Sequence, residues 1–238
     1  MKRTLALLAI LSIAIIAPAA ADAEWFVEPY AGAGFTRDVD LDVNASGGGF
    51  SFNGELQSIE LEDSPTFGLR IGRWLDSIPN FGLAVDLFYS RPDIKAQTVT
   101  FTGTGSVTVG DQIVIAAGST QAQLGDIDIY IVGFSADAML RFPLGEGKNG
   151  APPPFQPYLF VGPAWILTVA DNDKVEPSLG LKAGAGLSFL IGPTFGLFAE
   201  YRYTRFSPEG QIESRGVKAE LETDAQSHTI VGGISLRF

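Results

Sequence analysis

The sequence predicts an all-β protein, an eight-stranded antiparallel up-and-down transmembrane β-barrel that follows a cleaved signal peptide. Eight segments alternate large apolar residues with small or charged ones at a period of two. Short connections alternate with long ones between these segments. Because residues i and i+2 of a strand share one face, the first observation predicts strands, each with one apolar face. The second places the short turns and the long loops at opposite ends of a barrel.

Composition excludes several classes of protein. The 238 residues carry a formal net charge of −11, so the chain has no electrostatic reason to bind nucleic acid. There is no cysteine, which excludes a disulfide framework, a thiolate nucleophile and a cysteine-ligated metal. With 46% hydrophobic and 18% charged residues, the chain is too apolar to be intrinsically disordered.

Residues 1–23 have the pattern of a secretory signal peptide. Lys2 and Arg3 precede the apolar run Leu5–Ala17, and the segment ends in Ala21-Asp22-Ala23. A buried N-terminal helix or a membrane anchor is the alternative, but the run is shorter than the roughly 20 residues that span a bilayer. We therefore expect export, with residues 24–238 forming the barrel domain.

The four N-terminal strands are expected at Glu24–Thr36, Pro65–Leu75, Asn80–Ser90 and Ile127–Phe142. In the last three, a run of alternate Phe, Leu, Val or Ile residues faces away from Gly, Ala and a few charges. Both faces of the first strand carry large residues, so the sequence leaves open which of them faces the lumen.

The four C-terminal strands are expected at Phe155–Val169, Ser178–Leu190, Thr194–Phe206 and Gln226–Phe238. The last three alternate clearly, with Gly, Lys, Glu and Arg opposite the apolar set. The lumen phase of Phe155–Val169 also stays open, since apolar residues occupy both of its faces.

The connections between these strands differ in length. Asp76–Pro79 and Ile191–Pro193 are tight, and Pro143–Pro154 is moderate. The long connections are Arg37–Ser64, Arg91–Gly125, Ala170–Pro177 and Ser207–Ala225. Alternation inside Arg91–Gly125 predicts that this segment continues as a hairpin beyond the barrel.

The polar faces indicate that the apolar faces point outward to lipid. A soluble, lipocalin-like barrel would bury its apolar face and show Lys and Glu to water. Here Gly alternates with a few charges of both signs, which suits a narrow lumen where unpaired charge is costly. Aromatic residues also gather at both strand ends, as at two membrane–water boundaries; at the short-turn end we expect Trp74, Phe81, Phe142, Phe189, Phe195 and Phe238. The expected interior charges are Glu28, Arg70, Asp86, Asp137, Arg141, Lys182, Glu200, Arg202 and Arg237.

Two C-terminal segments carry a family resemblance. Thr194–Phe206 resembles the seventh strand of the small eight-stranded bacterial outer-membrane barrels, the group of the outer membrane protein A transmembrane domain and the opacity-like porins. The end of the chain resembles that group's barrel-assembly signal, with Gly233, Leu236 and Phe238 in place. The resemblance implies an outer-membrane location, recognition by the barrel-assembly machinery, short turns in the periplasm and long loops outside.

Three further patterns in the sequence are candidate sites. His228, the only histidine, is expected near the outer-leaflet boundary; outer-membrane lipid A deacylases carry an H-x-S pair at that level, but Ile230 stands where the Ser would be. The acids of Asp38–Asn44 lack the Gly and Glu of a calcium loop; because they alternate with Val39, Leu41 and Val43, we expect one face of a strand rising above the membrane, with weak divalent binding as the alternative. Gly-x-Gly runs such as Gly184-Ala185-Gly186 precede no helix and predict no phosphate loop.

The sequence thus favours a non-enzymatic outer-membrane protein without a cofactor. Its expected role is structural or surface-interacting, with interior charges plugging the lumen. The expected partners are membrane lipid, lipopolysaccharide, the assembly machinery and a molecule met by the long loops. A narrow porin-like channel for ions or small solutes is the alternative, and an outer-leaflet lipid hydrolase is the third hypothesis. Fold alone does not choose among them.

Overall fold

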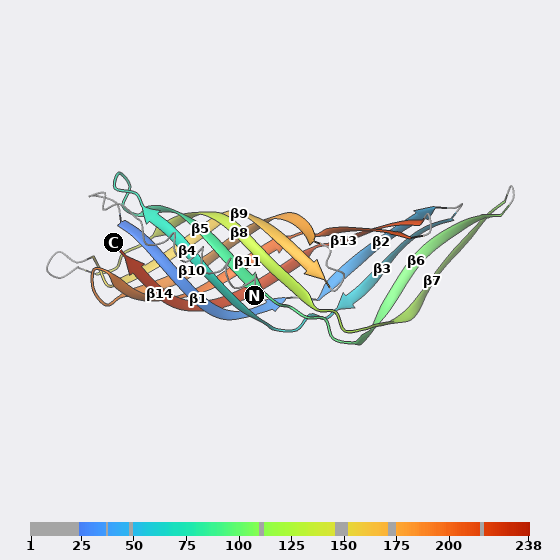
Figure 1. Ribbon diagram of the computed structural model, residues 1–238, viewed down its shortest axis with the longest axis horizontal. Coiled ribbons are helices and arrows are strands. Elements are labelled where there is room, and N and C mark those ends of the chain that lie inside the picture. The colour runs from blue at the N-terminus through green and yellow to red at the C-terminus, as the bar shows by residue number, and fades with distance from the viewer. Residues whose placement is uncertain are drawn as a thin grey trace, which may run out of the picture.

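Figure 1 shows the computed structural model, which describes residues 24–36, 38–47, 50–109, 112–145, 152–170, 175–214 and 217–238. The predicted signal peptide, residues 1–23, lies outside the described residues. In the described part of the chain, no helix is long and apolar enough to cross a membrane.

Eight antiparallel strands close into a barrel in the order β1-β14-β11-β10-β9-β8-β5-β4. Backbone pairing of β1 with both β14 and β4 closes the ring, so the barrel has no free edge. These strands match the eight predicted segments, with ends that differ by at most a few residues, and the predicted fold class is confirmed. Their bounds are β1 Glu24–Thr36, β4 Ser64–Trp74, β5 Phe81–Ser90, β8 Ile129–Arg141, β9 Phe155–Ala170, β10 Val175–Leu190, β11 Phe195–Phe206 and β14 Ala225–Arg237.

Six further strands form a second sheet in the order β12-β13-β2-β3-β6-β7. Three hairpins supply them, one from each of three long connections, and they extend beyond one mouth of the barrel (Figure 1). Only the β6–β7 hairpin was predicted as such. We call this end of the barrel the sheet end, and the opposite end, with Glu24 and Phe238, the termini end. The bounds are β2 Val39–Gly47, β3 Phe50–Ile59, β6 Gln97–Val109, β7 Gln112–Leu124, β12 Glu209–Ser214 and β13 Val217–Thr223.

Alternate residues of the barrel strands point outward and are apolar. The exposed set includes Leu83, Leu159, Leu181, Leu197 and Ile230. Ion-paired charges such as Arg70, Asp86 and Lys182 are buried inside instead, which is the reverse of a soluble barrel. The lipocalin-like alternative is therefore wrong.

The two strands whose lumen phase was open both turn their even-numbered residues inward. In β1 these include Phe26, Glu28 and Tyr30, and in β9 they include Tyr158 and Phe160. The lumen is therefore filled by aromatic rings as well as by charges.

Trp74 corrects one expectation. The sequence predicts Trp74 in the aromatic girdle at the short-turn end, but the residue is only 4% exposed and packs inside the barrel against Phe26. The reason is parity: residue 74 shares the inward face of its strand with Arg70.

Candidate functional site

Arg70 is the centre of the lumen network. Its Nη2 atom lies 2.6 Å from Glu28 Oε2, and its Nη1 atom donates to Glu200 Oε2 at 2.6 Å. The Tyr158 hydroxyl donates to the same Glu200 oxygen at 2.7 Å, and Arg202 Nε donates to the other one. The Arg70 guanidinium is fully buried, so its contacts with Glu28 and Glu200 offset the cost of removing its charge from water.

Asp86 is the second node of the network. Its Oδ2 atom lies 2.5 Å from Lys182 Nζ and 3.0 Å from Arg202 Nη1, and its Oδ1 atom accepts the Tyr30 hydroxyl at 2.7 Å. Lys182 also lies 2.7 Å from Asp137 Oδ2. One carboxylate therefore ties together groups from three other strands.

A smaller network fills the termini end. Glu24 lies 2.6 Å from both Arg141 Nη1 and Arg237 Nη1, and Arg237 donates to Gln156 Oε1 at 3.1 Å. The Arg141 guanidinium lies 4.4 Å from the Trp74 ring centroid, a cation–π contact. This network and the central one stack along the lumen.

All nine interior charges expected from the sequence are buried, and they fall into these two groups. The structure adds one carboxylate that sequence reasoning missed, Glu24, which brings the set to five acids and five bases. It also adds the hydroxyls of Tyr30 and Tyr158. All three lie on β1 and β9, the strands whose lumen face the sequence does not identify. We call the following residues the central cluster: Glu28, Arg70, Asp86, Asp137, Lys182, Glu200 and Arg202.

Two glycines make room for the tyrosines of the network. A Cβ atom at Gly186 would lie 2.3 Å from the Tyr158 ring, and one at Gly68 would lie 2.1 Å from the Tyr30 hydroxyl. Any larger side chain would displace these rings, because the lumen of an eight-stranded barrel is only just wide enough for its side chains.

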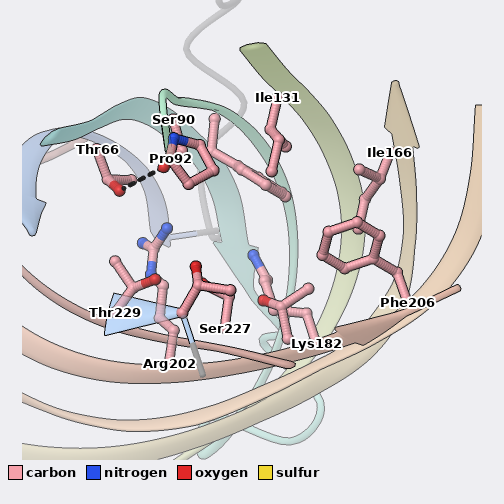
Figure 2. A pocket seen from close by; sticks show the side chains of 13 residues that line it. Thr66, Ser90, Pro92, Ile131, Ile166, Lys182, Arg202, Phe206, Ser227 and Thr229 are labelled. Carbon is pink, nitrogen blue, oxygen red and sulfur yellow. Dashed lines mark hydrogen bonds between the residues drawn. The ribbon is translucent and has the colours of Figure 1, made fainter. Parts of the chain in front are cut away.

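Above the central cluster, toward the sheet end, lies a small cavity of about 30 Å³. Figure 2 shows Thr66, Thr229 and Arg202 on one side of it and Ile131, Ile166 and Phe206 on the other. The volume is that of about one water molecule. The side chains thus leave little free space at this level of the lumen.

His228 lies on the outer face of β14, not in the lumen. Its Nδ1 atom is 2.6 Å from the Tyr201 hydroxyl, and its ring packs on Tyr203. Ser227, the adjacent hydroxyl, turns to the inner face and lines the small cavity. The two residues of a Ser–His hydrolase pair are therefore not brought together here.

The acidic segment Asp38–Asn44 runs into strand β2, with Asp40 and Asp42 exposed on one face. Among the described residues no group of three His, Cys, Asp or Glu side chains is placed to hold a metal ion. The Asp40 carboxylate instead accepts the backbone N–H of Ser58, at 2.9 Å.

The C-terminal residues complete the barrel. Phe238 exchanges two backbone hydrogen bonds with Trp25, at 2.9 and 3.1 Å, and its side chain points outward. Leu236 also faces outward, whereas a Cβ atom at Gly233 would lie 2.8 Å from the Phe198 ring. Two members of the predicted assembly signal are thus accessible on the outer surface.

The second sheet has two unlike edges. Strand β7 is 13 residues long, and its sequence contains no charged residue and no proline. Strand β12, at the other edge, has 6 residues and includes Glu209 and Glu213. Proteins protect sheet edges by shortness, charge or proline, and β7 has none of these.

Comparisons with known proteins agree with this geometry. The chain matches the family model of the outer membrane protein beta-barrel domain over residues 5–238. Among solved structures, it is similar to the outer membrane protein OprG from Pseudomonas aeruginosa, at 12% identity and a TM-score of 0.52, covering 91% of this chain and 96% of that one. It is also similar to Neisserial surface protein A, at 20% identity and a TM-score of 0.45, covering 90% and 97%. No curated protein matches the chain.

Proposed function

Because the chain belongs to the outer membrane protein beta-barrel domain family, we propose that it is a non-conducting surface protein whose outer sheet binds an extended segment of a partner protein. The barrel anchors the molecule in the outer membrane, with its apolar face against lipid. The sheet end stands outside the cell, where it also meets lipopolysaccharide, and Leu236 and Phe238 present the end of the chain to the barrel-assembly machinery.

The lumen network supports the non-conducting part of the proposal. Five acids and five bases form buried ion pairs, and several of these pairs, such as Arg70–Glu200 and Arg202–Asp86, cross the barrel with aromatic rings beside them. An ion would have to break several of these buried pairs to pass. The alternative, a narrow porin-like channel, requires that these ion pairs separate and re-form each time an ion passes.

The observation that carries the binding role is the bare edge of β7. Among the residues that the structure describes, its outward backbone N–H and C=O groups have no partner strand, because the sheet order ends at β7. An extended peptide can add to such an edge as another strand, so that main-chain hydrogen bonds supply affinity. The β6–β7 hairpin carries small Thr, Ser, Gly and Ala side chains, which allow close approach.

A peptide with the sequence of residues 97–109, the natural neighbour of β7, provides a defined probe. We expect saturable binding of the fluorescently labelled peptide to the protein in lipid nanodiscs. A version with proline at alternate positions should not bind, because proline cannot donate to the ladder. Equal binding of both peptides would exclude strand addition.

Two substitutions on cross-strand partners locate the binding edge. Ser119 in β7 lies opposite Thr102 in β6. Ser119→Lys places a charge on the edge strand, and Thr102→Lys places the same charge one strand further in. We expect Ser119→Lys to weaken peptide binding about tenfold more than Thr102→Lys. Equal effects would show that the peptide binds a face of the sheet instead.

We infer no enzymatic role. The third hypothesis, a lipid hydrolase, needs a nucleophile beside His228, and the hydroxyl that bonds its Nδ1 atom is that of Tyr201. This arrangement favours a polar residue of the membrane boundary over a catalytic histidine.

A further inference from the structure

A second cavity, of about 240 Å³, lies where the barrel opens into the sheet. We call it the mouth chamber. Its wall is mainly apolar and includes Val39, Leu41, Ile59, Ile94, Ile127 and Ile129. It exceeds the ~150 Å³ of an apolar protein cavity that takes up benzene. It is also smaller than the ~300 Å³ at which drug-sized pockets begin.

The mouth chamber adjoins the small cavity shown in Figure 2. Five residues line both cavities: Thr36, Pro92, Ile131, Phe206 and Ser227. Together the two cavities form a column whose upper part is apolar and whose floor is the central cluster.

Arg202 gives the floor of this column an unused donor. Its side chain is only 4% exposed, Nε donates to Glu200, and Nη1 donates to Asp86. Its Nη2 atom is buried without a hydrogen-bond partner among the described residues. A buried cationic donor left unpaired costs about 1–3 kcal/mol or more, so this position favours an occupant that brings an acceptor oxygen.

The charges of the central cluster determine what kind of acceptor fits. The cluster holds four carboxylates and three cations, and Glu176 is the one charged residue among the described residues that line the mouth chamber. A further anion would add to an acidic, poorly hydrated environment and would be penalised. A neutral carbonyl or ether oxygen satisfies Arg202 Nη2 without that cost.

We propose that this column is a binding site for a neutral amphiphile. The ligand has an apolar body of about eight carbons in the mouth chamber and one uncharged acceptor oxygen at Arg202 Nη2. This site is separate from the β7 edge, so the proposal stands independently of strand addition.

The test uses the barrel in lipid nanodiscs with ¹³C-methyl isoleucine, because isoleucines mark both the chamber and the lipid face. We expect 2-octanone to shift the Ile94, Ile127 and Ile129 methyl signals saturably. Ile230 and Ile234 face lipid and report simple partitioning. Shifts that are confined to these two residues, or that never saturate, would overturn the proposal.

Three ligands of equal chain length test the chemistry of the head group. We expect 2-octanone to bind about tenfold more tightly than octane, and more tightly than octanoate. Octane binding as tightly as the ketone would show an apolar cavity without a polar contact. Tighter octanoate binding would show an anion site. Either result contradicts the proposal.

Substitutions test the two halves of the column. Arg202→Lys removes Nη2 and is expected to reduce ketone affinity to that of octane. Thr168, whose hydroxyl also lacks a partner in the chamber wall, is the competing head-group contact; a loss on Thr168→Val alone would overturn the assignment to Arg202. If Arg202→Lys does not fold, Ile94→Trp fills the chamber. It should abolish the saturable shifts, whereas Ile230→Trp on the lipid face should retain them.

Discussion

Arg202 and Asp86 meet across the full width of the lumen. Arg202 belongs to β11 and Asp86 to β5, which lie four strands apart in either direction round the closed ring. Their Nη1 and Oδ2 atoms are nevertheless 3.0 Å apart. The ion pair therefore acts as a crossbar between opposite walls, and the Arg70–Glu200 pair is a second one, spanning three strands.

Asp86→Asn is predicted to destabilise the barrel strongly. The carboxylate faces Lys182, Arg202 and the Tyr30 hydroxyl, and none of these groups is exposed to water. Removing its charge leaves two buried cations undercompensated, which costs about 3–5 kcal/mol. Urea unfolding in detergent micelles, followed by the shift of the heat-modifiable band, measures this loss.

Asp224→Asn is the matched control for that substitution. Asp224 also pairs with an arginine, Arg205, but both side chains are exposed. The hydrogen bond from Arg205 lowers the pKa of Asp224, and water and salt screen the pair. We expect its unfolding midpoint to stay near that of the wild type. A comparable loss of stability in Asp86→Asn and Asp224→Asn would show that the buried ion pairs stabilise the barrel no more than an exposed pair does.

Planar-bilayer recording is predicted to show no steady openings of the refolded wild-type protein. We also expect Glu200→Ala to stay silent, because Asp86 still joins Arg202 and Lys182 across the lumen. A folded, heat-modifiable band on the gel is the control that the silent protein has inserted as a barrel. Wild-type openings altered by Glu200→Ala would instead support a gated pore with the interior charges as its gate.

Gly186→Ala is predicted to disturb the network without touching any charge. The added methyl group would meet the Tyr158 ring at 2.3 Å, and the Tyr158 hydroxyl bonds both Arg70 and Glu200. Overpacking of this kind costs about 1–3 kcal/mol. Gly118→Ala is the control, since no atom of the described residues lies within 4 Å of a Cβ atom there. Equal stability of the two variants by urea unfolding would show that Tyr158 shifts freely.

The sequence predicts the barrel well because lipid outside and ions inside impose a strict period of two. In strands such as β11, Leu197 and Tyr201 alternate with Glu200 and Arg202, and this pattern predicts without ambiguity which face of the strand lines the lumen. Strands β1 and β9 could not be phased because their lumen faces carry Phe26 and Phe160, which look like lipid-facing residues. The missed tyrosines and Glu24 all follow from that ambiguity.

The second sheet was harder to predict for a different reason. Neither of its faces is covered by lipid, so no strict alternation is required of its strands. Strands β12 and β13 are short and polar, and β2 pairs β3 through a register shift between Val39 and Leu41. The pairing of one hairpin with the next, for example of Glu220 in β13 with Asn44 in β2, depends on tertiary contacts. No local sequence pattern predicts these contacts.

His228→Ala is predicted to leave membrane lipids unchanged. The Nδ1 atom bonds the Tyr201 hydroxyl on the outer face, so we expect only the loss of one hydrogen bond, about 1 kcal/mol. Mass spectrometry of lipid A from cells that express the wild type, the variant or neither protein provides the check. If lipid A lost an acyl chain only in cells that express the wild type, the hydrolase hypothesis would be supported again.

Phe238→Ala is predicted to impair assembly in cells but not folding in vitro. The backbone of residue 238 pairs with Trp25 whichever side chain it carries, and the phenyl ring is 56% exposed on the outer surface. Its loss therefore removes little packing from the barrel. The resemblance of the C-terminus to an assembly signal predicts a several-fold lower level in isolated outer membranes.

Ile230→Ala is the matched control, because Ile230 lies on the outer face of the same strand with the same exposed fraction, 56%. Both variants should refold into detergent micelles like the wild type, since each loses a similarly exposed apolar group. Only Phe238→Ala should accumulate poorly in the membrane if the terminal ring is read by the assembly machinery. If both variants fell equally in cells, loss of lipid-facing apolar surface would explain the defect, and recognition of Phe238 would be excluded.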